Sequence, residues 1–582
     1  MHFYGFLSNR LTSALVGPDT SVDWLPYPRF DSPSVLTRLL GDHRHGYFRF
    51  DWDGDPAVEQ SYVAGSNVLE TRIGARREIT ITDFLDPARP TLCRAVETRQ
   101  EISFSLSLAF QYGLIPARIR RHRDRLRFSN PLGEGSLDLA VYDARGHRLP
   151  PAAQVKSGAA VWPLRPGRYL VELGSIEERA VLSEKVKEAV HHWRRLVPSS
   201  YRGPHREAFE RSLLVLYGLT YSPTRAVIAA PTTSLPEELG GTRQWDYRFT
   251  WVRDAAYVAE AWLMAGVTEA ARDLLHFLLS LVGPEPEPFA APLVRIDGSW
   301  HQQERELPWL PGYQGSRPCR EGNGAASQLQ LDIEGDLIWA VARYLELSQD
   351  LAFVSRHWPQ IRRIVDFVAA HWQRRDASLW EFRNREAHYT HSKLMCWVAL
   401  SKGAELAESL GHREHGARWA HTAQAVREAI ERHGVDPQRG HYVQQFGGRG
   451  VDAALLLFPL YGYCPVDAPR FQATLRAIER ELVDRGWVYR YRQDMLGAAQ
   501  HPFVLANTWL ARIYWRQGEV AKAEAALAPV LAAQTDLGLL GEHVDIQTGT
   551  PRGNFPQAFS HLGILQVLAE MAETSAMVSV GR

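Results

Sequence analysis

The period of the hydrophobic residues changes once along this 582-residue chain, near residue 182, and this change limits the possible folds most. Before it, short segments such as residues 78–84 and 101–108 alternate polar and apolar residues. An alternation of period two predicts strands with one buried face. After it, apolar residues recur every three to four positions, which predicts amphipathic helices. We therefore expect an N-terminal antiparallel β-sandwich followed by an all-α domain.

The helical part contains about twelve amphipathic segments, most of them roughly 14–22 residues long. They are expected to begin near Arg206, Trp251, Glu269, Leu329, Leu351, Tyr389, His412, Val451, Ala468, His501, Glu519 and Asn554. Twelve helices in six pairs are the number found in an (α/α)6 toroid, whose inner ring leaves a cavity at one end. The predicted domains are the sandwich (1–182), a linker helix (183–203) and the toroid (204–582).

Composition excludes several classes of function. Lys+Arg and Asp+Glu number 66 each, so a net charge of zero gives no electrostatic case for nucleic acid or an anionic membrane. The N-terminus lacks the basic region and apolar run of a secretory signal, and no window reaches the roughly 18 apolar residues of a membrane span. The four cysteines form no CxxC pair, which favours reduced thiols in a cytoplasmic protein.

The chemistry-bearing residues are aromatic, basic and acidic side chains that crowd together, above all in residues 243–254. Aromatic faces stack on the apolar faces of sugar rings, while Arg and Asp hydrogen-bond to hydroxyl groups. Glu381 and Glu542 lie in similar surroundings about 160 residues apart. Paired carboxylates are what cleavage of a glycosidic bond requires, one as proton donor and one as base or nucleophile. The sequence therefore predicts a glycoside hydrolase.

Particular motifs strengthen this prediction. Residues 13–19 and 23–33 (Asp-Trp-Leu-Pro-Tyr-Pro-Arg-Phe-Asp-Ser-Pro in the second), together with 229–237, resemble the trehalase-like branch of glycoside hydrolase family 15. This family includes glucoamylases, glucodextranases and bacterial-type trehalases, and the resemblance covers nearly the whole chain. It implies a β-sandwich, an (α/α)6 domain, and exo-acting, inverting hydrolysis of α-glucosides with release of β-glucose.

The resemblance also implies roles for single residues. Glu381 in Trp380-Glu381 matches the family's general acid, and Glu542 matches its general base. The substrate-binding residues implied by the other motifs are Tyr247, Trp251, Arg253, Asp254, Arg317, Trp380, Arg490 and Tyr491. A general acid must keep its proton at neutral pH, and the flanking Trp380 and Phe382 could supply the apolar surroundings that this requires.

The chain also departs from the family pattern. His543 follows the expected base where the family usually has Gln or Glu, and residues 384–387 and 495–496 differ as well. These changes leave the reaction in place but weaken any conclusion about the second sugar subsite. Trehalose and short malto- or isomalto-oligosaccharides therefore stay open as substrates, with a slight preference for trehalose.

Other interpretations differ in what they need from the site. An inverting disaccharide phosphorylase uses phosphate in place of water and needs no second carboxylate, so the presence of Glu542 favours hydrolysis. A glycan-binding pseudoenzyme would not need both glutamates. Asp246 and Glu321 could support the site or be purely structural. The histidines show no metal-ligand spacing, so we expect neither metal nor cofactor. The partner is then a small oligosaccharide, and a homo-oligomer stays open.

Overall fold

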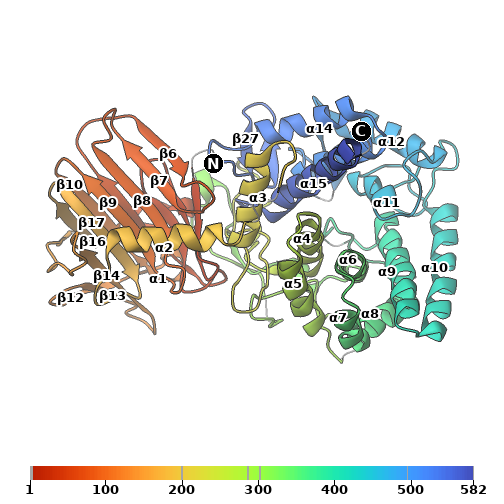
Figure 1. The fold of residues 1–582 in the computed structure, drawn as a ribbon, viewed down its shortest axis with the longest axis horizontal. Coiled ribbons are helices and arrows are strands. Elements are labelled where there is room, and N and C mark those ends of the chain that lie inside the picture. The colour runs from red at the N-terminus through yellow and green to blue at the C-terminus, as the bar shows by residue number, and fades with distance from the viewer. Residues whose placement is uncertain are drawn as a thin grey trace.

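The computed structural model describes residues 4–156, 158–197, 201–284, 287–300, 303–383, 385–494 and 496–580. Its N-terminal part contains two antiparallel sheets of eight strands each (Figure 1). The first sheet comprises β1 (Gly5–Ser8), β2 (Ser13–Val16), β3 (Val22–Pro26), β4 (Ser34–Leu36), β5 (Tyr47–Asp51), β10 (Ile102–Ser107), β15 (Gln154–Lys156) and β16 (Ala159–Leu164). The second comprises β6 (Val58–Tyr62), β7 (Leu69–Ile73), β8 (Ile79–Leu85), β9 (Leu92–Thr98), β12 (Arg118–Arg121), β13 (Leu126–Ser129), β14 (Ser136–Tyr142) and β17 (Gly167–Gly174). The predicted β-sandwich is confirmed.

The alternating segments of the sequence form strands with one buried face. Residues 78–84 overlap β8 and residues 101–108 contain β10, and buried and half-buried side chains alternate over most of each strand. Strands β5 and β10 pair antiparallel, with Phe50 opposite Phe104, and the ring centroids of Phe48 and Phe104 lie 5.4 Å apart. Trp162 of β16 stacks on Phe104 at 5.8 Å. These rings form the aromatic centre of the sandwich core.

A helix, α2 (Leu182–Arg194), follows the sandwich and packs against β8 and β17 through Leu182, Ala189 and Trp193. The described helices after it are α3 (Arg206–Gly218), α4 (Val252–Met264), α5 (Thr268–Ser280), α6 (Ile333–Ser348), α7 (Leu351–Arg356), α8 (Trp358–His371), α9 (Thr390–Ser409), α10 (Arg413–His433), α11 (Leu457–Leu460), α12 (Pro469–Leu482), α13 (Val504–Arg516), α14 (Val520–Ala532) and α15 (Ala558–Val580). A 3-10 turn, η5 (Ala453–Leu456), runs into α11.

The inner helices form a closed ring. Each inner element contacts the next, in the order α4, α6, α9, η5, α13 and α15, and α15 contacts α4 to close the ring. The intervening helices α5, α8, α10, α12 and α14 pack outside this ring, and α3 packs against α15 (Figure 1). Nearly every residue of α4 is buried, whereas α10 buries only one face, as expected for inner and outer positions. This arrangement confirms the (α/α)6 toroid.

The eighth predicted helix is shorter than expected. The sequence predicts a helix of more than a dozen residues from Val451, but η5 and α11 together cover only residues 453–460. Pro459 has no backbone N–H to donate, and Gly462 adopts φ +74°, which ends the helix. The fifth predicted segment is divided into α7 and α8, with Pro359 in the first turn of the second.

The loops of the toroid contain short two-stranded antiparallel ribbons. They pair β18 (Thr250–Trp251) with β19 (Leu293–Val294), β20 (Arg305–Glu306) with β21 (Arg320–Glu321), β22 (Val483–Asp484) with β23 (Trp487–Val488), β24 (Gln493–Asp494) with β25 (Gly497–Ala498), and β26 (His543–Asp545) with β27 (Thr550–Arg552). Among the described helices, none combines the length and apolar character needed to cross a bilayer.

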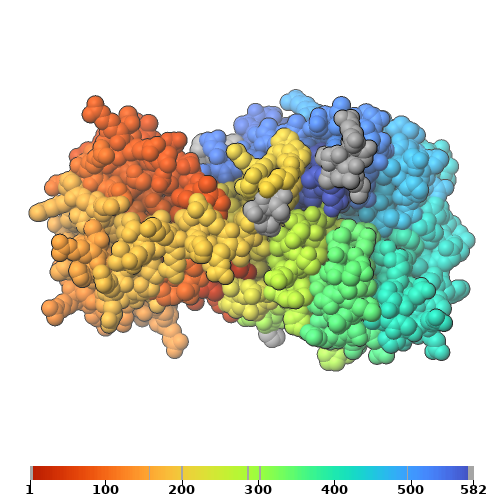
Figure 2. Space-filling view, in the orientation of Figure 1, coloured from red at the N-terminus to blue at the C-terminus, as the bar shows by residue number. Residues whose placement is uncertain are grey.

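Buried polar contacts join the sandwich to the toroid, and the two parts form one continuous surface in the view of Figure 2. Tyr112, in a turn of the N-terminal part, accepts a hydrogen bond from Arg248 at 2.6 Å and donates one to Glu321 at 2.9 Å. Arg248 in turn pairs with Asp246 at 2.7 Å, and neither side chain is exposed. Asp246 and Glu321 therefore have structural roles at this junction.

Candidate active site

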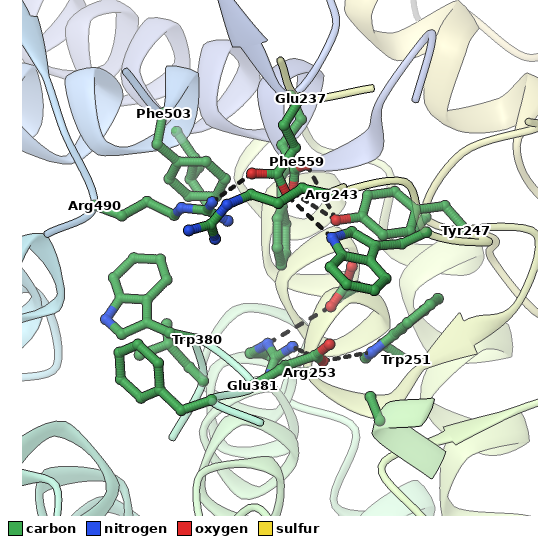
Figure 3. Close-up of a pocket in the computed structure, with 18 of the residues that line it drawn as sticks. Glu237, Arg243, Tyr247, Trp251, Arg253, Trp380, Glu381, Arg490, Phe503 and Phe559 are labelled. Atoms are coloured by element: carbon green, nitrogen blue, oxygen red, sulfur yellow. Dashed lines mark hydrogen bonds and ion pairs between the residues drawn. The ribbon is translucent and has the colours of Figure 1, made fainter. Parts of the chain in front are cut away.

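A pocket lies where the N-terminal ends of inner helices meet the long loops of the toroid (Figure 3). The start of α4 supplies one wall, and the starts of α13 and α15 supply another. Its lining residues are Ala229, Glu237, Arg243, Trp245, Tyr247, Trp251, Arg253, Asp254, Tyr257, Asn323, Ala325, Gln328, Leu379, Trp380, Glu381, Phe382, Arg383, Arg490, Tyr491, Asp494, Leu496, Phe503, Leu505, Trp509, Glu542, Gln557 and Phe559. Loops on a rigid scaffold are where binding and catalytic groups usually lie.

Glu381 is held by donors that converge on one of its two carboxyl oxygens. Oε1 accepts hydrogen bonds from Trp251 Nε1 at 2.7 Å, Arg253 Nη2 at 3.0 Å and Gln330 Nε2 at 3.3 Å. The other oxygen, Oε2, is therefore the one available to carry a proton. The backbone of Glu381 has φ +57°, in the left-handed region that residues other than glycine rarely adopt. Such strain is often found at functional sites.

Glu542 immediately precedes β26 and reaches the pocket from the opposite side of the ring. The hydroxyl of Tyr247 donates to both of its carboxylate oxygens, each at 3.0 Å. Its side chain is only 7% exposed, so this contact fixes the carboxylate in largely dehydrated surroundings. Gly553, at φ +76°, lets the chain after β27 approach closely, because a Cβ there would lie 3.3 Å from the Cβ of Glu542.

The first turn of α4 places a cation and a neutral acid on the pocket floor. Arg253 donates to Gln330 Oε1 at 2.8 Å and to Asp332 Oδ2 at 3.1 Å as well as to Glu381. Burial raises the pKa of Asp254 to about 8, against the influence of Arg253 and with the help of the Glu381 and Glu542 carboxylates. Near neutral pH, Asp254 is thus a protonated acid that can donate a hydrogen bond.

The wall opposite α4 carries two ion pairs. Arg490 Nη2 contacts Glu237 Oε2 at 2.7 Å, and Arg243 makes two contacts with Asp494, at 2.7 and 2.6 Å. Burial opposes ionisation of Glu237, but Arg490, followed by His543 and Arg243, outweighs it and lowers the pKa of this carboxyl. Glu237 is therefore a carboxylate that fixes the guanidinium of Arg490 beside the pocket.

Aromatic side chains form the rest of the wall. Trp380 meets Tyr491 and Phe503 edge to face, with ring centroids 6.0 and 5.7 Å apart. The guanidinium of Arg383 lies 4.2 Å from the ring centroid of Trp245. Aromatic surfaces next to fixed charged groups are suited to sugar rings, which present apolar faces and a rim of hydroxyl groups.

The structure brings nine of the ten predicted site residues into this one pocket. They are Tyr247, Trp251, Arg253, Asp254, Trp380, Glu381, Arg490, Tyr491 and Glu542. Arg317 does not line it: the side chain is exposed, and its Nε donates to the carbonyl of Pro311 at 3.4 Å. Asn384 and Met495, in the two segments that depart from the family pattern, lie outside the described residues.

The sequence did not predict several of the pocket residues to be site residues. Arg243 and Trp245 belong to the crowded stretch 243–254, so their composition was the available signal. Glu237 ends the segment 229–237 that resembles the family, but nothing in that segment marks it as a site residue, and its contact with Arg490, 253 residues away, reveals its role. Arg383 carries no local signal at all.

Two clusters among the described residues have the spacing of metal ligands. In the first, Asp86, Cys93 and Glu172, nearby Arg89 and Lys185 already neutralise the carboxylates: Arg89 lies 2.7 Å from Asp86, and Lys185 lies 3.1 Å from it. The second cluster consists of Glu237, Glu542 and His543 and belongs to the pocket wall. The absence of a metal stays a prediction.

Comparison with known proteins gives a consistent result. Residues 203–569 match the family model described as glycosyl hydrolases family 15, and residues 2–134 match one described as trehalase-like, N-terminal. The chain is 39% identical to Trehalase 1 of Sulfolobus acidocaldarius over 97% of its own length and 98% of that protein. It is 36% identical to Trehalase 2 of the same organism, over 98% and 99% of the two chains.

A solved structure supports the fold over the whole chain. A bacterial glucoamylase in complex with acarbose superposes with a TM-score of 0.71 at 13% identity, covering 98% of this chain and 94% of that one. The family matches, together with a pocket that contains two fixed glutamates, show that this chain is a glycoside hydrolase. Within that class it belongs to glycosyl hydrolases family 15, the family that its sequence motifs resemble.

Proposed function

We propose that this protein hydrolyses trehalose with inversion at one anomeric carbon, with Glu381 as general acid and Glu542 as general base. The observation that carries the proposal is the pair of glutamates held by separate sets of donors in one pocket. The preference for trehalose is supported by the relatives named trehalases, which match this chain over nearly its whole length. The N-terminal match to a trehalase-like family model adds to that support.

Glu381 is suited to the acid role because its two oxygens differ. Three donors occupy Oε1, which leaves the proton on Oε2. That proton passes to the glycosidic oxygen as the bond from this oxygen to the anomeric carbon breaks. The departing glucose leaves as a neutral alcohol, and Glu381 becomes a carboxylate that Arg253 stabilises at 3.0 Å.

Glu542 is suited to the base role because it accepts hydrogen bonds and is nearly excluded from solvent. It takes a proton from a water molecule that attacks the anomeric carbon on the face opposite the leaving oxygen. A positive charge develops on the sugar ring during this step, and the negative charge of Glu542 favours it electrostatically. Hydrolysis of trehalose in this way yields one β-glucose from the attacked ring and one α-glucose from the leaving ring.

Proton NMR of the anomeric signals tests the stereochemistry and the substrate together. Trehalose, maltose and isomaltose are followed from the first turnover, with and without inorganic phosphate. We expect equal initial amounts of α- and β-glucose from trehalose. Release of α-glucose alone would show retention, and formation of glucose 1-phosphate when phosphate is present would show phosphorolysis. If maltose or isomaltose is cleaved faster than trehalose, that sugar is the preferred substrate and trehalose is not.

The roles of the two glutamates are tested by substitution. Glu381→Gln and Glu542→Gln should each lower kcat by about 10²–10⁴ because the amide can neither donate nor accept the required proton. Glu386→Gln, an exposed carboxylate in the same loop as Glu381, is the matched control and should behave as wild type. Normal turnover of either pocket variant would remove that residue from its proposed role.

A further inference from the structure

The imidazole of His543 lies directly behind the pocket wall. His543 is the first residue of β26 and follows Glu542, and it is 1% exposed. It is not among the residues that line the pocket, whereas its neighbours Glu542 and Glu237 are. Any influence of His543 on a bound sugar therefore acts through these two carboxylates.

The two ring nitrogens of His543 face different partners. Nδ1 lies 2.9 Å from the carbonyl oxygen of Pro502, which can only accept a hydrogen bond, so Nδ1 carries a proton. Nε2 lies 3.4 Å from Glu542 Oε2 and 3.6 Å from Glu237 Oε2, and among the described residues no group makes a hydrogen bond with it. An unprotonated Nε2 would place its lone pair close to two carboxylates. A proton on Nε2 converts this repulsion into attraction.

The charges around His543 balance only when the ring is cationic. Glu542 and Glu237 face it with two negative charges, and Arg490, bonded to Glu237 at 2.7 Å, supplies one positive charge. Arg243 is paired with Asp494 and leaves no charge to balance that of the two glutamates. Burial, followed by the charge of His543, lowers the pKa of His501 to about 4, so His501 stays neutral. Unbalanced buried charge is costly, and an imidazolium at His543 removes the imbalance.

We propose that His543 is a positioning residue that, as an imidazolium, keeps Glu542 ionised and fixed in place for its role as base. This inference rests on the proposed function, because it assigns a task to His543 only if Glu542 is the base.

A divalent metal ion is the rival occupant of the same place, since Glu237, Glu542 and His543 have ligand spacing. The electrostatics disfavour it. Arg490 already holds Glu237 Oε2 at 2.7 Å, and this is the oxygen that also faces His543. A metal ion there would lie next to a guanidinium, whereas the imidazolium provides the needed charge without an additional ion.

Two substitutions of His543 remove the positive charge of its side chain but keep part of its shape and hydrogen bonding. His543→Gln keeps a hydrogen-bond donor near the position of Nε2, and His543→Asn keeps a donor near the position of Nδ1, but both remove the cation. We expect the acid limb of the kcat/KM profile for trehalose to move to higher pH by roughly one unit in both variants. KM should stay within about twofold of the wild-type value at the pH optimum, because His543 does not line the pocket.

His501→Gln is the matched control. His501 is also partly buried and close to His543, but it lies in no ion pair with Glu542. This variant should keep the wild-type acid limb. An acid limb that does not move in folded His543 variants would overturn the proposal, even if their thermal stability falls. If Glu542→Gln retains normal turnover, the proposed function fails instead, so the two failures are distinguishable.

Two further measurements keep the proposal testable if neither variant folds. Wild-type enzyme labelled with ¹³C at the histidine ε1 position should show an imidazolium signal throughout the pH range of full activity, and its absence would overturn the proposal. Dialysis against EDTA, followed by addition of Mg²⁺ or Zn²⁺, should leave kcat unchanged. Loss of activity that one of these ions restores would place a metal among the three side chains and overturn the imidazolium.

Discussion

At the scale of single residues, the position of Glu381 depends on donors that lie far away in the sequence. Trp251 and Arg253 are 130 and 128 residues from Glu381, yet both bind the same carboxyl oxygen. In the proposed mechanism, Oε1 is occupied and proton transfer from Glu381 uses the other oxygen. The orientation of this carboxyl group is therefore determined by the start of α4 and not by the loop in which Glu381 lies.

Trp251→Phe tests this dependence. The substitution keeps an aromatic ring but removes the 2.7 Å hydrogen bond from Nε1 to Glu381. We expect kcat for trehalose to fall about tenfold, equivalent to the roughly 1.4 kcal/mol that one hydrogen bond contributes, with little change in KM. Steady-state kinetics check this, with Trp419→Phe as control because Trp419 lies in the core and donates to Asp366 instead. A raised KM with unchanged kcat would show that Trp251 serves binding alone.

Short motifs explain how much of the site the sequence could predict. Trp380-Glu381 and the residues from Tyr247 to Asp254 carry recognisable spacing, and the structure brings them into one pocket. Partners such as Glu237 and Arg383 were missed because their identity depends on contacts across the ring, which no local pattern encodes. The charge state of Asp254 was equally hidden, since burial by distant helices causes it.

At the scale of elements, the period of apolar residues predicted the helices well except where glycine and proline act. Most segments begin within four residues of the expected positions, because amphipathic faces must meet neighbouring helices. The segment after Val451 failed because Pro459 cannot extend the backbone hydrogen bonding of a helix. The periodicity therefore gave the order of helices, whereas local backbone chemistry set their lengths.

Gly335→Ala tests the close packing of the inner ring. Gly335 lies in the first turns of α6, and a Cβ there would come within 2.3 Å of the backbone oxygen of Met395 in α9. Because a backbone atom cannot move aside easily, we expect a loss of about 2–3 kcal/mol in the free energy of unfolding. Gly416→Ala in α10 is the control, since it meets nothing nearer than 3.3 Å and gains helix propensity. Thermal denaturation compares them; equal midpoints for the two variants would contradict this reasoning.

At the scale of the whole molecule, closure of the ring joins distant parts of the chain. His561 in α15 is fully buried, with Nδ1 3.1 Å from Ser212 Oγ of α3 and Nε2 accepting from the backbone N–H of Leu540 at 3.2 Å. Burial, followed by the charge of Arg211, lowers the pKa of His561 to about 3. The ring is thus neutral in the folded protein over most of the acidic range.

This histidine predicts how stability depends on pH. Between its ordinary value of 6.5 and about 3, the unfolded chain binds a proton at His561 and the folded chain does not. Stability is therefore present above pH 6.5 and falls as the pH decreases, by roughly 1.4 kcal/mol per pH unit from this group. His561→Gln should flatten the decrease in melting temperature between pH 6.5 and pH 4, whereas exposed His433→Gln should not. Parallel curves for both variants would exclude His561 as the cause.

The closed ring also sets the order of events during synthesis. The toroid begins with α3, which ends at Gly218, but the helix that contacts both α3 and α4 begins only at Ala558. At ribosomal rates the intervening chain takes on the order of half a minute to appear. Throughout that interval the apolar faces of the inner helices have no closing partner, and Glu542 is among the last residues to arrive. A nascent chain therefore has neither a closed ring nor a complete pocket until α15 has been synthesised.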